Sequence, residues 1–282
     1  MSHRSLIAVD IGNTRMKFGW FCLADFASFG GELAPPRAEL ELPTTAWSPE
    51  QMQAWLELLA AAPRAPDQTE AAAEPRSWQQ IPWRIGSVHR AAAGKLLGWL
   101  RSELPRAPAR LLTHADFPIK LAVQFPEKLG IDRIAAAVAA NRLRAPDQAA
   151  IVVDLGSALT VDLISADGTF RGGAILPGIG LSARALHEFT DQLPLIPLSE
   201  LAEPVPPLGD STVAALRAGL YWGAVGAMRE LIARLGAGLY PAPHILLTGG
   251  AAPAVAGLLG PEVRYVEHLV LRGIALANGS RG

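Results

Sequence analysis

The chain has 282 residues, of which half are hydrophobic and 18% charged, a composition that predicts a large buried core and excludes a disordered protein. Its 25 basic and 26 acidic residues nearly balance, which argues against a nucleic-acid or anionic-membrane partner, and no apolar run approaches the roughly 20 residues of a membrane span. The single cysteine, Cys22, excludes an internal disulfide and a cysteine-based zinc site and fits a cytoplasmic protein.

The first predicted elements are two strands joined by a short polar turn. Residues 6–9 are an apolar run typical of a buried strand, and residues 16–20 alternate apolar and polar side chains as a second strand does. Further along, the spacing predicts a helix around residues 52–59 and a strand–helix–strand unit over residues 85–112. Residues 60–76, rich in Ala, Pro and Glu, are predicted to form a solvated loop.

The opening pattern returns in the second half of the chain. Residues 151–153 are again a buried strand, and residues 159–163 and 170–175 are the next strands. Helices are predicted around residues 181–189 and 213–235, and a late strand over residues 245–247. The two strand–turn–strand units indicate a duplication, with lobes at residues 1–146 and 147–282 and a cleft between them.

Each unit has Asp-x-Gly where its first strand ends, at Asp10 and at Asp154. Glycine lets backbone N–H groups approach phosphate oxygens, and an aspartate beside phosphate implies Mg²⁺ between them, held through water. A lone Asp-x-Gly is more often an ordinary turn, but two copies at equivalent places favour nucleotide binding. No G-x-x-x-x-G-K-[ST] loop is present, and Gly178-Ile179-Gly180 follows a proline and is interpreted as a tight turn before a helix.

Asp132 is the candidate catalytic carboxylate. It lies in the first turn of a helix predicted to open at Gly130-Ile131-Asp132-Arg133, where the helix dipole favours an anion. A plain helix-start carboxylate is the alternative interpretation. Together with Arg133 and Gly130, the helix start is expected to form an anion-binding site that includes a general base. Such a site suits an acidic substrate whose hydroxyl is phosphorylated.

Five motifs in this order resemble those of type III pantothenate kinase, from residue 6 to about residue 277. They are Asp10-Ile11-Gly12-Asn13-Thr14 with Lys17, Gly130-Ile131-Asp132-Arg133, Asp154-Leu155-Gly156-Ser157-Ala158, Gly172-Gly173-Ala174-Ile175-Leu176-Pro177-Gly178, and Thr248-Gly249-Gly250. The resemblance implies an α/β, duplicated ribonuclease H-like fold of the actin and sugar-kinase type. It also implies ATP-dependent phosphorylation of pantothenate, the first step of coenzyme A synthesis.

The resemblance assigns roles to particular residues. Asp132 would be the proton acceptor, Asp154 a ligand of a monovalent cation (K⁺ or NH₄⁺), and Asp10 the Mg²⁺ contact. The ATP phosphates would be held by Asp10, Ile11, Gly12, Asn13, Thr14, Arg15, Met16, Lys17 and Ser157. Pantothenate would be held by Gly130, Ile131, Asp132, Arg133 and Thr190. The family resemblance also implies a homodimer.

The chain departs from the family pattern at four positions. Ser157 replaces the usual threonine and keeps its hydroxyl. Leu159 stands where the family often has a second threonine, and it has no hydroxyl. Ala251 stands where the family has an acidic residue, and Val123 where many members have a tyrosine. Two alternatives therefore stay open: a kinase of the same fold for another small acid or sugar, and a non-catalytic regulator.

Overall fold

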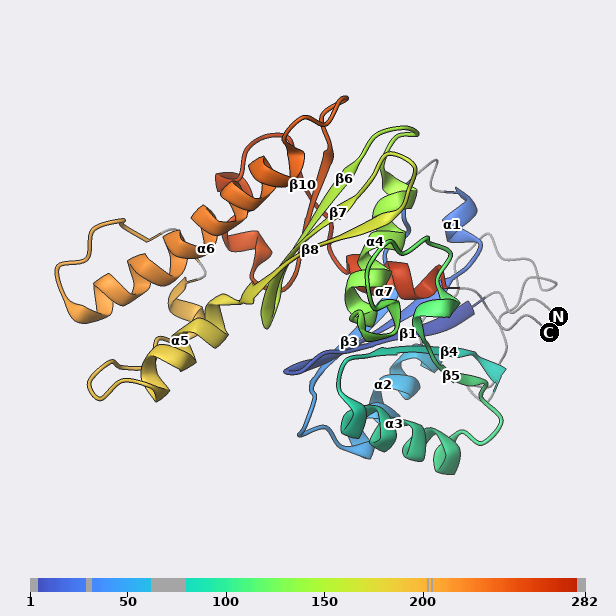
Figure 1. Ribbon diagram of the computed structural model, residues 1–282. Helices are drawn as coiled ribbons and strands as arrows, with labels where there is room; N and C mark the ends of the chain where they lie inside the picture. The colour runs from blue at the N-terminus through green and yellow to red at the C-terminus, as the bar shows by residue number, and fades with distance from the viewer. Residues whose placement is uncertain (1–4, 29–31, 62–79, 202, 204, 278–282) are drawn as a thin grey trace. The chain divides into compact units, whose positions relative to one another are not determined.

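The computed structural model describes residues 5–28, 32–61, 80–201, 203 and 205–277, and the chain forms two compact units (Figure 1). The first unit contains the chain up to Pro118, residues Glu127–Leu143 and the chain from Val270 onward. The second contains Ile119–Pro126 and Arg144–Leu269. The predicted lobes, residues 1–146 and 147–282, stay a prediction, since the described units exchange Ile119–Pro126 and the chain from Val270 onward. Most of the predicted Ala/Pro-rich insertion, residues 62–76, lies outside the described residues.

The sheet of the first unit has the order β3-β2-β1-β4-β5. Its first three strands pair antiparallel, and the last two extend the sheet in parallel: β1 (Ser5–Ile11), β2 (Arg15–Cys22), β3 (Ala38–Pro43), β4 (Trp83–Ser87) and β5 (Ala109–Leu111). Its helices are α1 (Asp25–Ser28), α2 (Pro49–Ala61), α3 (Arg90–Glu103), α4 (Ile131–Leu143) and α7 (Leu269–Ala275).

The two faces of this sheet are covered by different helices. Because side chains alternate along a strand, Ile7, Val9 and Ile11 all point to one face, where they join an apolar cluster with residues of α2 and α3. Trp83 lies fully buried in that cluster. On the other face, a methyl group at Gly86 would come within 2.9 Å of Ile131 in α4 and of Ile274 in α7. Helices α4 and α7 therefore cover the second face.

Helices α4 and α7 touch backbone to backbone. A methyl group in place of the hydrogen of Gly273 would overlap the backbone carbonyl of Ala135. Residues Ile134–Ala140 of α4 are all buried, although the sequence pattern identified only one apolar face. The contact of α7 with α4 and the packing of Ile131 over Gly86 fix where the first turn of α4 lies relative to the sheet of its own unit.

The second unit repeats this architecture. Its sheet has the order β10-β9-β6-β7-β8, with β6 (Ala150–Leu155), β7 (Ala158–Ile164) and β8 (Phe170–Pro177) antiparallel and β9 (His244–Thr248) and β10 (Val263–Tyr265) parallel to β6. Helices α5 (Ile179–Glu188) and α6 (Thr212–Gly236) pack on one face, where Ile151, Val153 and Leu155 of β6 join their core cluster. Counted from its own first strand, each sheet has the order 3-2-1-4-5. The predicted duplicated ribonuclease H-like α/β fold is confirmed.

Candidate functional site

The first Asp-x-Gly loop is a closed hairpin with an exposed tip. Gly12 donates its N–H to the carbonyl of Arg15 at 3.0 Å, and Asn13 and Thr14 are exposed. The buried side chain of Thr44 donates its hydroxyl to the carbonyl of Gly12 at 2.9 Å, while the N–H of Thr44 donates to the carbonyl of Thr14 at 3.0 Å. The loop is therefore held from below and leaves its tip open to a ligand. Sequence reasoning missed Thr44, because its role depends on a contact with Gly12, which lies 32 residues away in the chain.

Of the residues predicted to bind the ATP phosphates, some can contribute side chains and others only backbone groups. Ile11 and Met16 are fully buried, so their side chains belong to the core. Arg15 forms an exposed ion pair with Glu41 at 2.8 Å. The remaining polar groups of this segment, Asp10, Asn13, Thr14 and Lys17, are at least partly accessible.

Asp10 and Lys17 lie on the same face of the sheet as the start of α4. Asp10 is directly opposite Lys17 in the β1–β2 pair and opposite Gly86 in the β1–β4 pair. Residues opposite one another in neighbouring strands project to the same face. Since the missing side chain of Gly86 leaves room for Ile131, the carboxylate, the ammonium and the first turn of α4 all lie on one side of the sheet.

Asp132 is a partly buried carboxylate in the first turn of α4. Its Oδ1 accepts the backbone N–H of Arg133 at 2.8 Å. Burial raises the pKa of Asp132 above its usual value of 3.8, and this outweighs the opposing effect of the Arg133 N–H and of the Arg133 charge. A raised pKa makes a carboxylate a better proton acceptor, which is the property that a general base requires.

The second Asp-x-Gly loop is one residue shorter than the first. Leu155 pairs with Leu159, and Gly156 donates its N–H to the carbonyl of Ala158 at 3.0 Å. Ser157 is exposed, and its carbonyl accepts the N–H of Gly178 at 3.1 Å. Asp154 and Asp10 thus occupy the same place in the two units, each one residue before its first strand ends.

Gly249 lies directly against the carboxylate of Asp154. Its φ of 103° lies in the region that side chains rarely adopt, and a methyl group there would come within 2.6 Å of Asp154 Oδ1. The loop that follows β9 can therefore approach Asp154 only because it begins with glycine after Thr248. This contact brings together two of the five sequence motifs within the second unit.

The four departures and Thr190 all lie in the second unit. Leu159 is buried in the core cluster, which accounts for an apolar side chain there. Val123 lies beside Gly172, and Ala251 donates its N–H to the carbonyl of Leu155 at 3.2 Å. Thr190 is exposed just after α5, and its hydroxyl donates to the carbonyl of Leu186 at 2.6 Å.

The donor chemistry of the loops suits Mg²⁺ bound together with phosphate. Within the described residues, no group of three or more His, Cys, Asp or Glu side chains could hold a metal ion by itself. Mg²⁺ commonly keeps several waters and binds through one or two carboxylates and substrate phosphates, as the single carboxylate of Asp10 would allow.

Among the residues that the structure describes, no helix is long and apolar enough to cross a membrane.

Two matched Asp-x-Gly loops on a duplicated ribonuclease H-like fold define the class of proteins that includes actin and the sugar kinases. Within that class, the chain belongs to the type III pantothenate kinase family, whose model matches residues 6–234. It is 34% identical to the type III pantothenate kinase of Rhodopirellula baltica over 95% of this chain and 96% of that protein. It is 31% identical to that of Chlorobium luteolum, over 97% and 94%.

A second group of relatives matches more strongly over a shorter segment. The type III pantothenate kinase of Anaeromyxobacter sp. (strain K) is 42% identical over 152 residues, and the match spans 54% of this chain and 58% of that protein.

Proposed function

We propose that this protein transfers the γ-phosphoryl group of ATP to the terminal hydroxyl of pantothenate, forming 4'-phosphopantothenate at the start of coenzyme A synthesis in the cytoplasm. The observation that supports this function most directly is the match to type III pantothenate kinases of other bacteria over nearly the whole chain. It is supported by a partly buried carboxylate, Asp132, on the same face of the sheet as Asp10 and Lys17.

Phosphoryl transfer depends mainly on positioning and on neutralising charge. The open tip of the first loop, at Gly12, Asn13 and Thr14, binds the ATP phosphates, and Lys17 contributes a positive charge beside it. Mg²⁺, held through water by Asp10, would neutralise the phosphate oxygens when bound. Ser157 of the second loop supplies a further hydroxyl to ATP.

Asp132 acts on the acceptor hydroxyl. Its Oδ1 is engaged by the N–H of Arg133, so Oδ2 is the atom that accepts the proton. As the hydroxyl oxygen bonds to the γ-phosphorus, the bond from that phosphorus to the β–γ bridging oxygen breaks and ADP leaves. The proton of the hydroxyl passes to Asp132, whose raised pKa favours this transfer.

The acidic substrate is held by charge and by backbone groups at the start of α4. Arg133 pairs with the carboxylate of pantothenate, and the N-terminal end of α4, at Gly130 and Ile131, faces the anion with the positive end of the helix dipole. Thr190 contributes a hydroxyl to the same substrate. Asp154 supplies a hard oxygen ligand to K⁺ or NH₄⁺.

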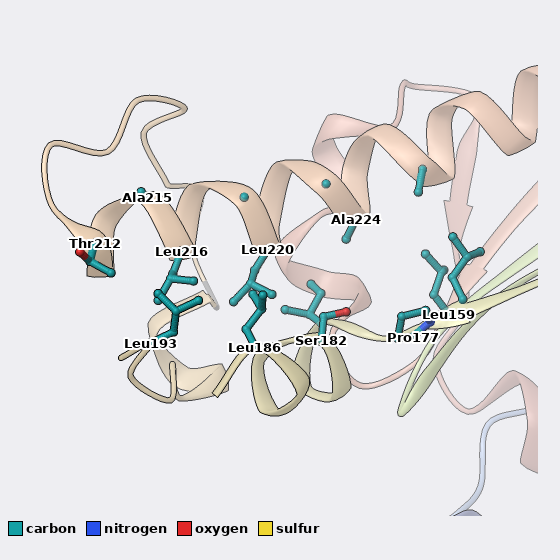
Figure 2. Close-up of a pocket in the computed structure, with 15 residues that line it drawn as sticks. Leu159, Pro177, Ser182, Leu186, Leu193, Thr212, Ala215, Leu216, Leu220 and Ala224 are labelled. Carbon is teal, nitrogen blue, oxygen red and sulfur yellow. The ribbon is translucent and has the colours of Figure 1, made fainter. Parts of the chain in front are cut away.

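We further infer that the protein is a homodimer and that α5 and α6 form its interface. A largely apolar groove of about 590 Å³ lies between them, and Figure 2 shows Leu216 and Leu220 of α6 pointing toward Leu193 and Leu186. Neighbouring apolar side chains are exposed, with Phe189 exposed to 84%. Exposed apolar surface of this kind marks an interaction site, and we propose that its partner is the same surface of a second copy, related by a two-fold axis.

An assay of ADP release with and without pantothenate tests the activity. ADP release should require pantothenate; a panel of sugars and other hydroxy acids tests the same-fold kinase alternative, and no release with any acceptor would favour the regulator.

Asp132→Asn should lower turnover by roughly 10²–10⁴-fold. Its melting temperature should not fall, because burial disfavours the charged carboxylate that the neutral amide replaces. Turnover within a few-fold of the unmodified protein would place the base elsewhere.

A further inference from the structure

Gly130 stands immediately before α4, and the position of its missing side chain is occupied by the carboxylate of Asp132. A methyl group at Gly130 would overlap Asp132 Oδ1, and it would lie 3.6 Å from Asp132 Cγ and 3.8 Å from Val88 Cγ1. The nearest obstacle to a side chain is therefore not the backbone of a neighbouring element. It is the functional end of the candidate base.

The backbone at Gly130 does not itself require glycine. Its φ lies outside the left-handed region, unlike that of Gly172 or Gly249. Its carbonyl accepts the N–H of Ile134 at 3.2 Å, an ordinary first hydrogen bond of a helix. Alanine can adopt this conformation, so the fold alone gives no reason for the absence of a side chain here.

We propose that Gly130 is a positioning residue: its missing side chain leaves the space into which the Asp132 carboxylate turns. In that orientation Oδ1 accepts the Arg133 N–H, which leaves Oδ2 for the acceptor hydroxyl of the proposed reaction. A methyl group at position 130 would rotate the carboxylate away and break this hydrogen bond, while leaving α4 in place. This inference rests on the proposed role of Asp132 as the base.

The first experiment compares Gly130→Ala with Gly98→Ala by steady-state kinetics and thermal unfolding. Gly98 lies in α3 of the same unit, and beyond its chain neighbours and its own helix backbone no described atom comes within 4 Å of a methyl group there. Gly130→Ala should lower kcat by about 10²-fold, the cost of a misplaced catalytic group, with an unchanged KM for ATP and an undiminished melting temperature. Gly98→Ala should keep full activity. Full activity in Gly130→Ala would overturn the inference.

The second experiment repeats the substitution in an Asp132→Ala background under single-turnover conditions. With the carboxylate gone, the methyl group meets an empty space, so Gly130→Ala should cost less than two-fold. An equal loss in both backgrounds would show that Gly130 acts on the substrate directly and would overturn the inference. If Asp132→Ala alone kept wild-type turnover, the assignment of the base would fail instead.

Thermal unfolding of the double variant covers the case in which Gly130→Ala is unstable. If the methyl group destabilises the protein by striking the carboxylate, Asp132→Ala should restore the melting temperature. A double variant that remains as unstable as Gly130→Ala would overturn the proposed contact.

Discussion

Replacing Gly249 by alanine adds one methyl group to the loop that follows β9, and the structure gives its cost in two parts. The first part is conformational, because a φ of 103° is sparsely populated by residues with a side chain, which costs about 1–3 kcal/mol. The second part is steric, because the methyl group would lie 2.5 Å from the backbone carbonyl of Leu155 and 2.6 Å from Asp154 Oδ1. Overpacking of this kind costs about 1–3 kcal/mol.

Together the two parts predict that Gly249→Ala lowers the free energy of unfolding by about 2–6 kcal/mol. In a chain of this size, each kcal/mol lowers the melting temperature by roughly 2–4 °C, so a loss of at least about 4 °C is expected by circular dichroism. The matched control is Gly250→Ala. Beyond its chain neighbours, no described atom lies within 4 Å of a methyl group on Gly250, and its φ is outside the left-handed region.

The control should unfold within about 0.5 kcal/mol of the unmodified protein, as unconstrained surface substitutions do. Equal melting temperatures for the two variants would refute the reasoning, whether both are unchanged or both are lowered. The reasoning depends on the difference between two adjacent glycines, and a loss shared equally by both would mean that the loop responds to any added side chain.

Four further predictions concern activity and assembly. Asp10→Asn should severely reduce turnover with Mg-ATP without lowering the melting temperature; wild-type turnover would remove Asp10 from the Mg²⁺ role. Adding KCl or NH₄Cl to a Tris buffer should raise activity if Asp154 holds a monovalent cation; a flat response, or one no larger than that to NaCl at equal ionic strength, would contradict this. Because burial raises the pKa of Asp132, kcat should fall as the pH drops through that raised pKa, and an acid limb at or below 3.8 would count against the base. Light scattering should give twice the 29.8 kDa chain mass, and a monomer at tens of micromolar would refute the dimer.

The two Asp-x-Gly loops and α4 could be predicted because their signals are local. A buried strand that ends in Asp-x-Gly and is followed by alternation is contained within about a dozen residues, and the second copy confirms that the first is not accidental. The long helix α6 and the strand β9 were predicted for the same reason, since each has a continuous apolar pattern.

Strands β3 and β10 and helix α7 were not predicted, because distant partners stabilise them. The three residues of β10 are held by pairing with β9, and β3 is a half-exposed strand at the edge of its sheet. The seven residues of α7 are too few to show a helical period. Their place is set by the contact of Gly273 with Ala135 of α4, which lies 138 residues earlier in the chain.

The candidate site was predicted as a set of residues but not as an arrangement. Charge and motif order identified Asp10, Lys17 and Asp132. The register that puts Lys17 opposite Asp10, the anchoring of the loop by Thr44 and the burial that raises the pKa of Asp132 all depend on contacts between separate segments. A sequence pattern does not contain those contacts.

The close contact between α7 and α4 has a consequence for how the protein is made. During translation, the helix that carries Asp132 leaves the ribosome long before Gly273, its packing partner. The nascent chain can pair its first sheet while the packing around α4 is still incomplete, because α7 is synthesised only after every strand of the second sheet. A chain released before Gly273 would therefore contain every proposed catalytic residue and yet lack the contact of α7 with Ala135, in the helix that carries Asp132.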